Sequence, residues 1–138
     1  MRIMAIDYGD AHTGIAISDP TGLLAGVTTV INSRRLEVVV EQVTLLAKEH
    51  GAEELVLGHP VNMDGTLGPR SEKAKAMKAL LEEATALPVV LWDERRTTID
   101  AHNILFNSGK NAKQRKKVVD AVAASLILEG YLTFKKSH

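Results

Sequence analysis

The sequence contains no cysteine among its 138 residues. Disulfide bonds, thiolate metal sites and cysteine nucleophiles are therefore excluded, as is a secreted scaffold built on disulfides. No apolar run approaches the roughly 20 residues that a membrane-spanning helix needs. The N-terminal apolar stretch reaches the charge of Asp7 too soon to be a secretion signal. We therefore expect a cytoplasmic protein that does not bind a membrane.

Aromatic residues are also scarce, at 4% of the chain. A platform that stacks single-stranded bases needs several aromatic side chains on one face, so a nucleic acid would be recognised through its backbone and shape. Basic and acidic residues balance at 17 each, which argues against a wholly basic nucleic-acid-binding protein and requires a local basic patch for such a partner. The length and the 45% apolar content are typical of one soluble domain covering residues 1–138.

The hydrophobic pattern predicts an α/β fold. Three strand-like runs come first, and helices and strands then alternate. The predicted strands cover residues 3–7, 13–19, 24–31, 55–57 and 89–92, and the predicted helices cover 36–50, 71–86, about 97–106 and about 113–131. The order βββαβαβαα predicts a mixed five-stranded sheet, an antiparallel three-strand meander followed by parallel strands, with helices on both faces. The predicted core stripe of the second helix is Ala76, Leu80 and Leu81, and residues 135–138 are expected to form a loose tail.

Acidic residues stand at three places where a carboxylate is costly to bury. Asp7 ends the first predicted strand, and Asp93 and Glu94 follow the last. Asp120 heads the apolar stripe of the last helix, which continues through Ala123, Ala124, Ile127, Leu128 and Tyr131. Because the carboxyl ends of parallel strands share one edge, we expect these acids to meet there. Carboxylates without thiolate or paired histidine ligands suit Mg²⁺ or Mn²⁺, and such metal sites hydrolyse phosphodiesters.

Each acid also has an ordinary structural interpretation. Asp7 could cap the turn that follows it, since Gly9 suits such a turn. Acids at the ends of strands are common, and Asp120 could reach water or pair with a lysine.

Basic residues gather just before Asp120, in a stretch without acids that contains Lys110, Lys113, Arg115, Lys116 and Lys117. Cations near a helix N-terminus oppose the helix dipole, so this stretch adds little folding stability and suits contact with phosphates. A solvated helix face is the alternative. Arg95 and Arg96 follow the last strand and could hold a phosphate beside the metal. Arg70 follows a glycine-containing loop that could also contact phosphate.

These residues belong to four motifs that resemble the YqgF family, also called RuvX. The motifs read DYG at 7–9 with GIAISD at 14–19, GHPVNMDG at 58–65, DERRTT at 93–98 and DAVAASLIL at 120–128. The resemblance spans nearly the whole chain. It implies an RNase H-like fold and a metal-dependent nuclease that processes the 5′ end of pre-16S rRNA in ribosome biogenesis, with Holliday junction resolution as the alternative. It also implies that Asp7, Glu94 and Asp120 are catalytic metal ligands, with Asp93 as the alternative middle ligand.

Two residues depart from the family pattern. The family usually has an arginine where this chain has His12, and a leucine where it has His59. His12 could contact phosphate when protonated. We expect His59 to be an ordinary loop residue, with a substrate contact as the alternative.

Two other function classes compete with the nuclease. The hairpin from Asp7 to Gly14 also resembles the first phosphate loop of the actin and sugar-kinase superfamily, which normally needs two such domains to enclose ATP. A P-loop NTPase is excluded because no Walker motif is present. A non-catalytic RNA-binding factor of ribosome assembly is the third hypothesis. The chain is expected to act as a monomer or homodimer, and a resolvase would need the dimer to cut two strands.

Overall fold

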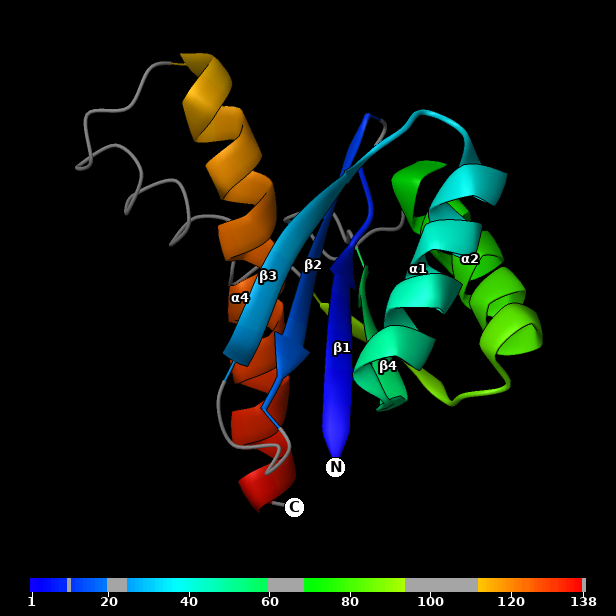
Figure 1. The fold of residues 1–138 in the computed structure, drawn as a ribbon, viewed down its shortest axis with the longest axis vertical. Helices are drawn as coiled ribbons and strands as arrows, with labels where there is room; N and C mark the ends of the chain where they lie inside the picture. The colour runs from blue at the N-terminus through cyan, green and yellow to red at the C-terminus, as the bar shows by residue number, and fades with distance from the viewer. Residues whose placement is uncertain (10, 20–24, 60–68, 94–111, 138) are drawn as a thin grey trace.

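The computed structural model describes residues 1–9, 11–19, 25–59, 69–93 and 112–137 (Figure 1). The strands in these ranges are β1 (Arg2–Asp7), β2 (His12–Ser18), β3 (Ala25–Asn32), β4 (Ala52–His59) and β5 (Val89–Asp93), and the helices are α1 (Leu36–His50), α2 (Pro69–Thr85) and α4 (Ala112–Ser137). The strands form one sheet in the order β3-β2-β1-β4-β5. β2 is antiparallel to β1 and β3, whereas β1, β4 and β5 are parallel.

This topology confirms the predicted meander followed by parallel strands. Every predicted strand is present, with ends that differ by a few residues. Gly51 ends α1 as expected, in the left-handed conformation with φ of 66°, and its N–H donates to the carbonyl of Lys48. The helix predicted at 97–106 lies outside the described residues, and so does most of the glycine-containing loop predicted before Arg70.

Both faces of the sheet are covered by helices. α1 and α2 lie on one face and α4 lies on the other (Figure 1). The alternation of β1 serves both layers, because Met4 and Ile6 pack toward α1 and α2 while Ile3 and Ala5 pack toward α4. All four of these side chains are buried. The central strand therefore reads as a nearly continuous apolar run that ends at Asp7.

The predicted apolar stripe of α4 is confirmed. Its members are buried against the sheet, and they are Ala123, Ala124, Ile127, Leu128 and Tyr131. α4 begins at the edge where β1 ends and runs back toward the start of β1 (Figure 1). Although α4 has 26 residues, none of the described helices combines the length and apolar character of a membrane span.

The core stripe of α2 differs from the prediction. Ala74, Met77 and Leu81 are buried, whereas Leu80 is 40% exposed and Ala76 is exposed. The buried residues follow a spacing of three and four, which is the period of one helix face. The prediction placed Leu80 in the core because leucine is apolar, but Leu80 lies one position away from the buried face.

The predicted loose tail is also wrong. α4 continues to Ser137, and Lys135 donates through Nζ to a carboxylate oxygen of Glu54 at 3.0 Å. Glu54 is only 9% exposed and accepts a second hydrogen bond from the Tyr131 hydroxyl. The end of α4 is therefore anchored to the beginning of β4.

Candidate functional site at the carboxyl edge of the sheet

Three strands end together at the edge where the site was predicted. The register pairs Ile6 of β1 with Leu57 of β4, and Leu57 with Leu91 of β5. Asp7 is the last residue of β1 and Asp93 the last of β5. The parallel register thus brings Asp7 and Asp93 to one edge of the sheet, because the carboxyl ends of parallel strands lie at the same edge.

Asp7 is half-buried at this edge. Its position in β1 has the parity of Ile3 and Ala5, so it lies on the α4 face of the sheet. Within the described part of the chain, its carboxylate has no hydrogen-bond donor and no ion-pair partner. A partly desolvated carboxylate without a partner is the kind of donor that a hard cation stabilises.

α4 brings Asp120 to the same edge. Tyr131 contacts Glu54, and Glu54 pairs with Ile3 of β1. From Ile3 to Asp7 the strand rises about 13 Å, and from Tyr131 back to Asp120 the helix rises about 16 Å. Because α4 runs opposite to β1 (Figure 1), the backbone of Asp120 lies near the level of Asp7. The structure describes the backbone of Asp120 and not its side chain.

The hairpin after Asp7 is tightly closed. Asp7 pairs with Gly14 of β2, and a Cβ added at Gly9 would collide with the carbonyl oxygen of His12. Glycine is therefore required at this position. The ring of His12 also contacts β3, because its Nδ1 lies 2.6 Å from Oδ1 of Asn32. The register pairs the same two residues.

The other predicted site residues are described incompletely. Glu94, Arg95, Arg96 and Lys110 lie outside the described residues. α2 and α4 both begin at the carboxyl edge of the sheet (Figure 1). Arg70 lies in the first turn of α2, and the basic residues of α4 lie in its first turns, so the backbones of these residues are at that edge. These basic residues of α4 are Lys113, Arg115, Lys116 and Lys117. His59, predicted in a loop, ends β4, and its backbone pairs with Asp93.

No group of three side chains that could hold a metal occurs among the residues that the structure describes. The carboxylates proposed from the sequence nevertheless suit Mg²⁺ or Mn²⁺ by their chemistry, because oxygen donors are what these cations prefer. The observation in this structure that fits such a cation is Asp7, which is half-buried and has no partner among the described residues.

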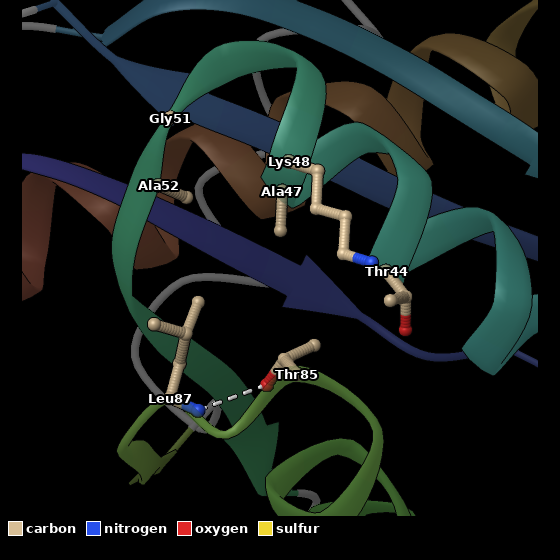
Figure 2. Close-up of a pocket in the computed structure, with 7 residues that line it drawn as sticks. All are labelled: Thr44, Ala47, Lys48, Gly51, Ala52, Thr85 and Leu87. Atoms are coloured by element: carbon tan, nitrogen blue, oxygen red, sulfur yellow. Dashed lines mark hydrogen bonds between the residues drawn. The ribbon is translucent and has the colours of Figure 1, made fainter.

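A pocket of about 210 Å³ lies at the opposite edge of the sheet. Figure 2 shows it between the ends of α1 and α2, near the beginning of β4. Both threonine hydroxyls that line it donate to carbonyl groups of their own helices, Thr44 to Val40 at 2.7 Å and Thr85 to Leu81 at 2.6 Å. The Leu87 N–H also donates to Thr85 (Figure 2). This pocket contains none of the predicted acids and is not the candidate site.

The buried carboxylate of Glu54 was not predicted from the sequence. It lies at the amino edge of the sheet, far from Asp7, and is held by Tyr131 and Lys135. Burial raises the pKa of the Tyr131 hydroxyl, and the hydrogen bond to Glu54 raises this pKa further. Glu54 thus fixes the position of α4 on the sheet. The prediction missed it because the predicted strand began at residue 55, whereas β4 begins at Ala52.

Known proteins resemble this chain over nearly its whole length. The chain matches the family described as "RuvX: Holliday junction resolvase" over residues 1–134. It is 43% identical over 135 residues to a protein of Halothermothrix orenii, covering 98% of this chain and 96% of that protein. It is 45% identical over 134 residues to a protein of Listeria monocytogenes, covering 96% and 97%. Both relatives are named "Putative pre-16S rRNA nuclease".

Solved structures show where this fold recurs. RuvC of T. thermophilus, in complex with a Holliday junction substrate, superposes with a TM-score of 0.63 at 14% identity, covering 99% of this chain and 96% of that one. A Fowlpox virus resolvase bound to Holliday junction DNA gives 0.57 at 11% identity, covering 99% and 98%. A hexokinase of Thermus thermophilus gives 0.52 at 23% identity, but the match covers only 38% of that chain. At such identities these likenesses establish the fold alone.

Proposed function

The chain belongs to the RuvX family, and from this premise we propose that it is a metal-dependent nuclease that processes the 5′ end of pre-16S rRNA. The family match and the names of the relatives confirm the predicted nuclease class. We further propose that its substrate is RNA, that it uses a divalent metal held by the residues named below, and that it acts in the cytoplasm.

The observation that carries the proposal is the position of Asp7. It ends the central strand as a half-buried carboxylate, and Asp120 belongs to the helix that covers the same face of the sheet. We propose that both carboxylates hold Mg²⁺ or Mn²⁺. When bound, this cation would activate a water and stabilise the leaving oxygen of a phosphodiester.

A third ligand completes the proposed site. β5 ends at Asp93, at the same edge of the sheet as Asp7, and Glu94 is the next residue of the chain. We propose Glu94 as the third metal ligand, with Asp93 as the alternative. The comparison of Glu94→Gln with Asp93→Asn tests this choice. We expect the first substitution to abolish cleavage and the second to leave most of it.

Basic residues would bind the nucleic acid around the carboxylates. Arg95 and Arg96 are proposed to hold the scissile phosphate or its neighbour, since guanidinium groups bind phosphate with two parallel hydrogen bonds. The phosphates farther along the substrate would meet Arg70 and the basic residues at the beginning of α4, which are Lys110, Lys113, Arg115, Lys116 and Lys117. Contacts of this kind attract the backbone without reading the bases.

Holliday junction cleavage is the second candidate, because the family description names that activity. The two candidates differ in stoichiometry, since a resolvase must cut two strands and needs two active sites. A processing nuclease needs only one, and a monomer suffices.

A cleavage assay decides between them. Fragments of pre-16S rRNA that carry the 5′ leader and four-way DNA junctions are each incubated with Mg²⁺, Mn²⁺, Ca²⁺ or EDTA. We expect cleavage of the RNA with Mg²⁺ or Mn²⁺, none with EDTA, and loss of cleavage in Asp7→Asn. The exposed Glu49 provides the control Glu49→Gln, which removes one charge far from the site. Cleavage of the junction alone would overturn the RNA assignment.

A further inference from the structure

His12 and Asn32 form a polar pair near Asp7, on the face where the metal site is proposed. His12 begins β2 and Asn32 ends β3, and the register pairs them. The His12 Nδ1 lies 2.6 Å from the Asn32 Oδ1. With the amide oriented in this way its oxygen can only accept a hydrogen bond, and the hydrogen of the pair is therefore assigned to Nδ1. In the neutral ring, Nε2 is then an acceptor, because the partner of one ring nitrogen sets the state of the other.

The strand register puts this ring beside Asp7. Asp7 pairs with Gly14, and His12 precedes Gly14 by two residues. The two side chains therefore belong to the same face, which Ala16 identifies as the α4 face. Diagonal neighbours of this kind are about 7–8 Å apart. Gly14 has no side chain to separate them.

A ring with an acceptor at Nε2 differs in kind from the guanidinium group of an arginine. Arginine only donates, and phosphate oxygens only accept. A neutral acceptor does not suit a phosphate, but it does suit the hydroxyl of a ribose. The 2′-hydroxyl is the group that distinguishes RNA from DNA at a single nucleotide.

We propose that His12 is a specificity residue for RNA, whose Nε2 accepts a hydrogen bond from the 2′-hydroxyl of a nucleotide beside Asp7. Asn32 is the positioning residue that fixes the tautomer and the orientation of the ring. The inference rests on the proposed nuclease function and names the substrate group that this end of the site reads.

A set of substitutions separates this role from a structural one. Glutamine has an oxygen near the place of Nε2, so His12→Gln keeps the acceptor, whereas His12→Arg keeps a basic group and loses the acceptor. Asn32→Asp keeps an acceptor for Nδ1–H, and Asn32→Ala removes it. If the pair only joined β2 to β3, all four variants would alter stability without altering the preference for ribose.

The test compares an RNA substrate with copies that carry a single 2′-deoxynucleotide at each position flanking the cut. The readout is the ratio of kcat/KM for the ribose and deoxyribose substrates. One hydrogen bond corresponds to about a fivefold ratio at one position. We expect this ratio in the wild type, in His12→Gln and in Asn32→Asp, and a ratio near one in His12→Arg and Asn32→Ala. A ribose preference that survives in His12→Arg would overturn the proposal.

A second measurement does not depend on cleavage. Nitrogen-15 NMR of the free protein reports which ring nitrogen of neutral His12 carries the hydrogen. We expect Nδ1–H in the wild type and a shift toward Nε2–H in Asn32→Ala, and an Nε2–H tautomer in the wild type would contradict the proposal. Binding of the same oligonucleotides in Ca²⁺ measures the ribose preference even if no substrate is cut. A failure of the nuclease assignment is thereby distinguished from a failure of the role of His12.

Discussion

Tyr131→Phe tests the anchor that fixes α4 on the sheet. The substitution removes one hydroxyl and leaves the ring, which packs against Trp92 with centroids 5.8 Å apart. Glu54 is 9% exposed and, among the described residues, would keep its side-chain bond to Lys135 alone. A hydrogen bond to a charged group contributes about 1.5–3 kcal/mol. We therefore expect the free energy of unfolding to fall by about 2 kcal/mol.

Urea unfolding followed by circular dichroism measures this change. The slope against urea should stay constant, because the surface exposed on unfolding is the same. Lys135→Gln is the comparison variant. The Lys135 side chain is 36% exposed and that of Glu54 is 11% exposed, and an amide can still donate a hydrogen bond to the carboxylate, so we expect a smaller loss of about 1 kcal/mol. A loss below about 0.5 kcal/mol in Tyr131→Phe would refute the reasoning, because Glu54 would then find another donor without cost.

The remaining predictions concern pH, the hairpin and the basic patch. The pKa of Tyr131 is higher in the folded protein than its unfolded value of about 10. The stabilisation by its hydroxyl is therefore complete below pH 10 and is lost as the pH rises above 10. The difference in unfolding free energy between the wild type and Tyr131→Phe should thus shrink between pH 8 and pH 11. Gly9→Ala should destabilise by about 1–3 kcal/mol in urea, because the new methyl group meets the carbonyl of His12; an unchanged midpoint would contradict the close approach. Lys116→Glu with Lys117→Glu should weaken RNA binding and flatten its dependence on salt, and an unchanged salt slope in fluorescence anisotropy would show that these lysines only face solvent.

Much of the fold could be predicted because local patterns and tertiary packing agree. The apolar stripe that follows Asp120 in α4 was predicted correctly, because its small and branched residues recur at the helical period and are buried against the sheet. In the core of α2 the prediction was right for Leu81 and wrong for Ala76 and Leu80, because the sequence alone does not decide which of two adjacent leucines faces the sheet. The tail was wrong because the buried carboxylate of Glu54 binds Lys135 across 81 residues of chain.

The candidate site could be predicted to a lesser degree. Strand order and direction are enough to bring Asp7 and the end of β5 to one edge. The pairing of His12 with Asn32 depends on the register between β2 and β3, and a shift of one residue would send these side chains to opposite faces. The sequence could therefore name His12 as a candidate contact, but it could not indicate which ring nitrogen is free.

The central claim is that Asp7 and Asp120 hold a divalent metal ion. Its most direct test is the affinity for Mn²⁺, measured by calorimetry on the wild type, Asp7→Asn, Asp120→Asn and the control Glu49→Gln. Losing a residue that merely supports a metal ligand lowers affinity about 10–100-fold, so losing a ligand should cost at least tenfold. We expect that loss in both aspartate variants, whose thermal unfolding should stay unchanged, and wild-type affinity in Glu49→Gln. Wild-type affinity for Mn²⁺ in Asp7→Asn and Asp120→Asn would contradict the claim.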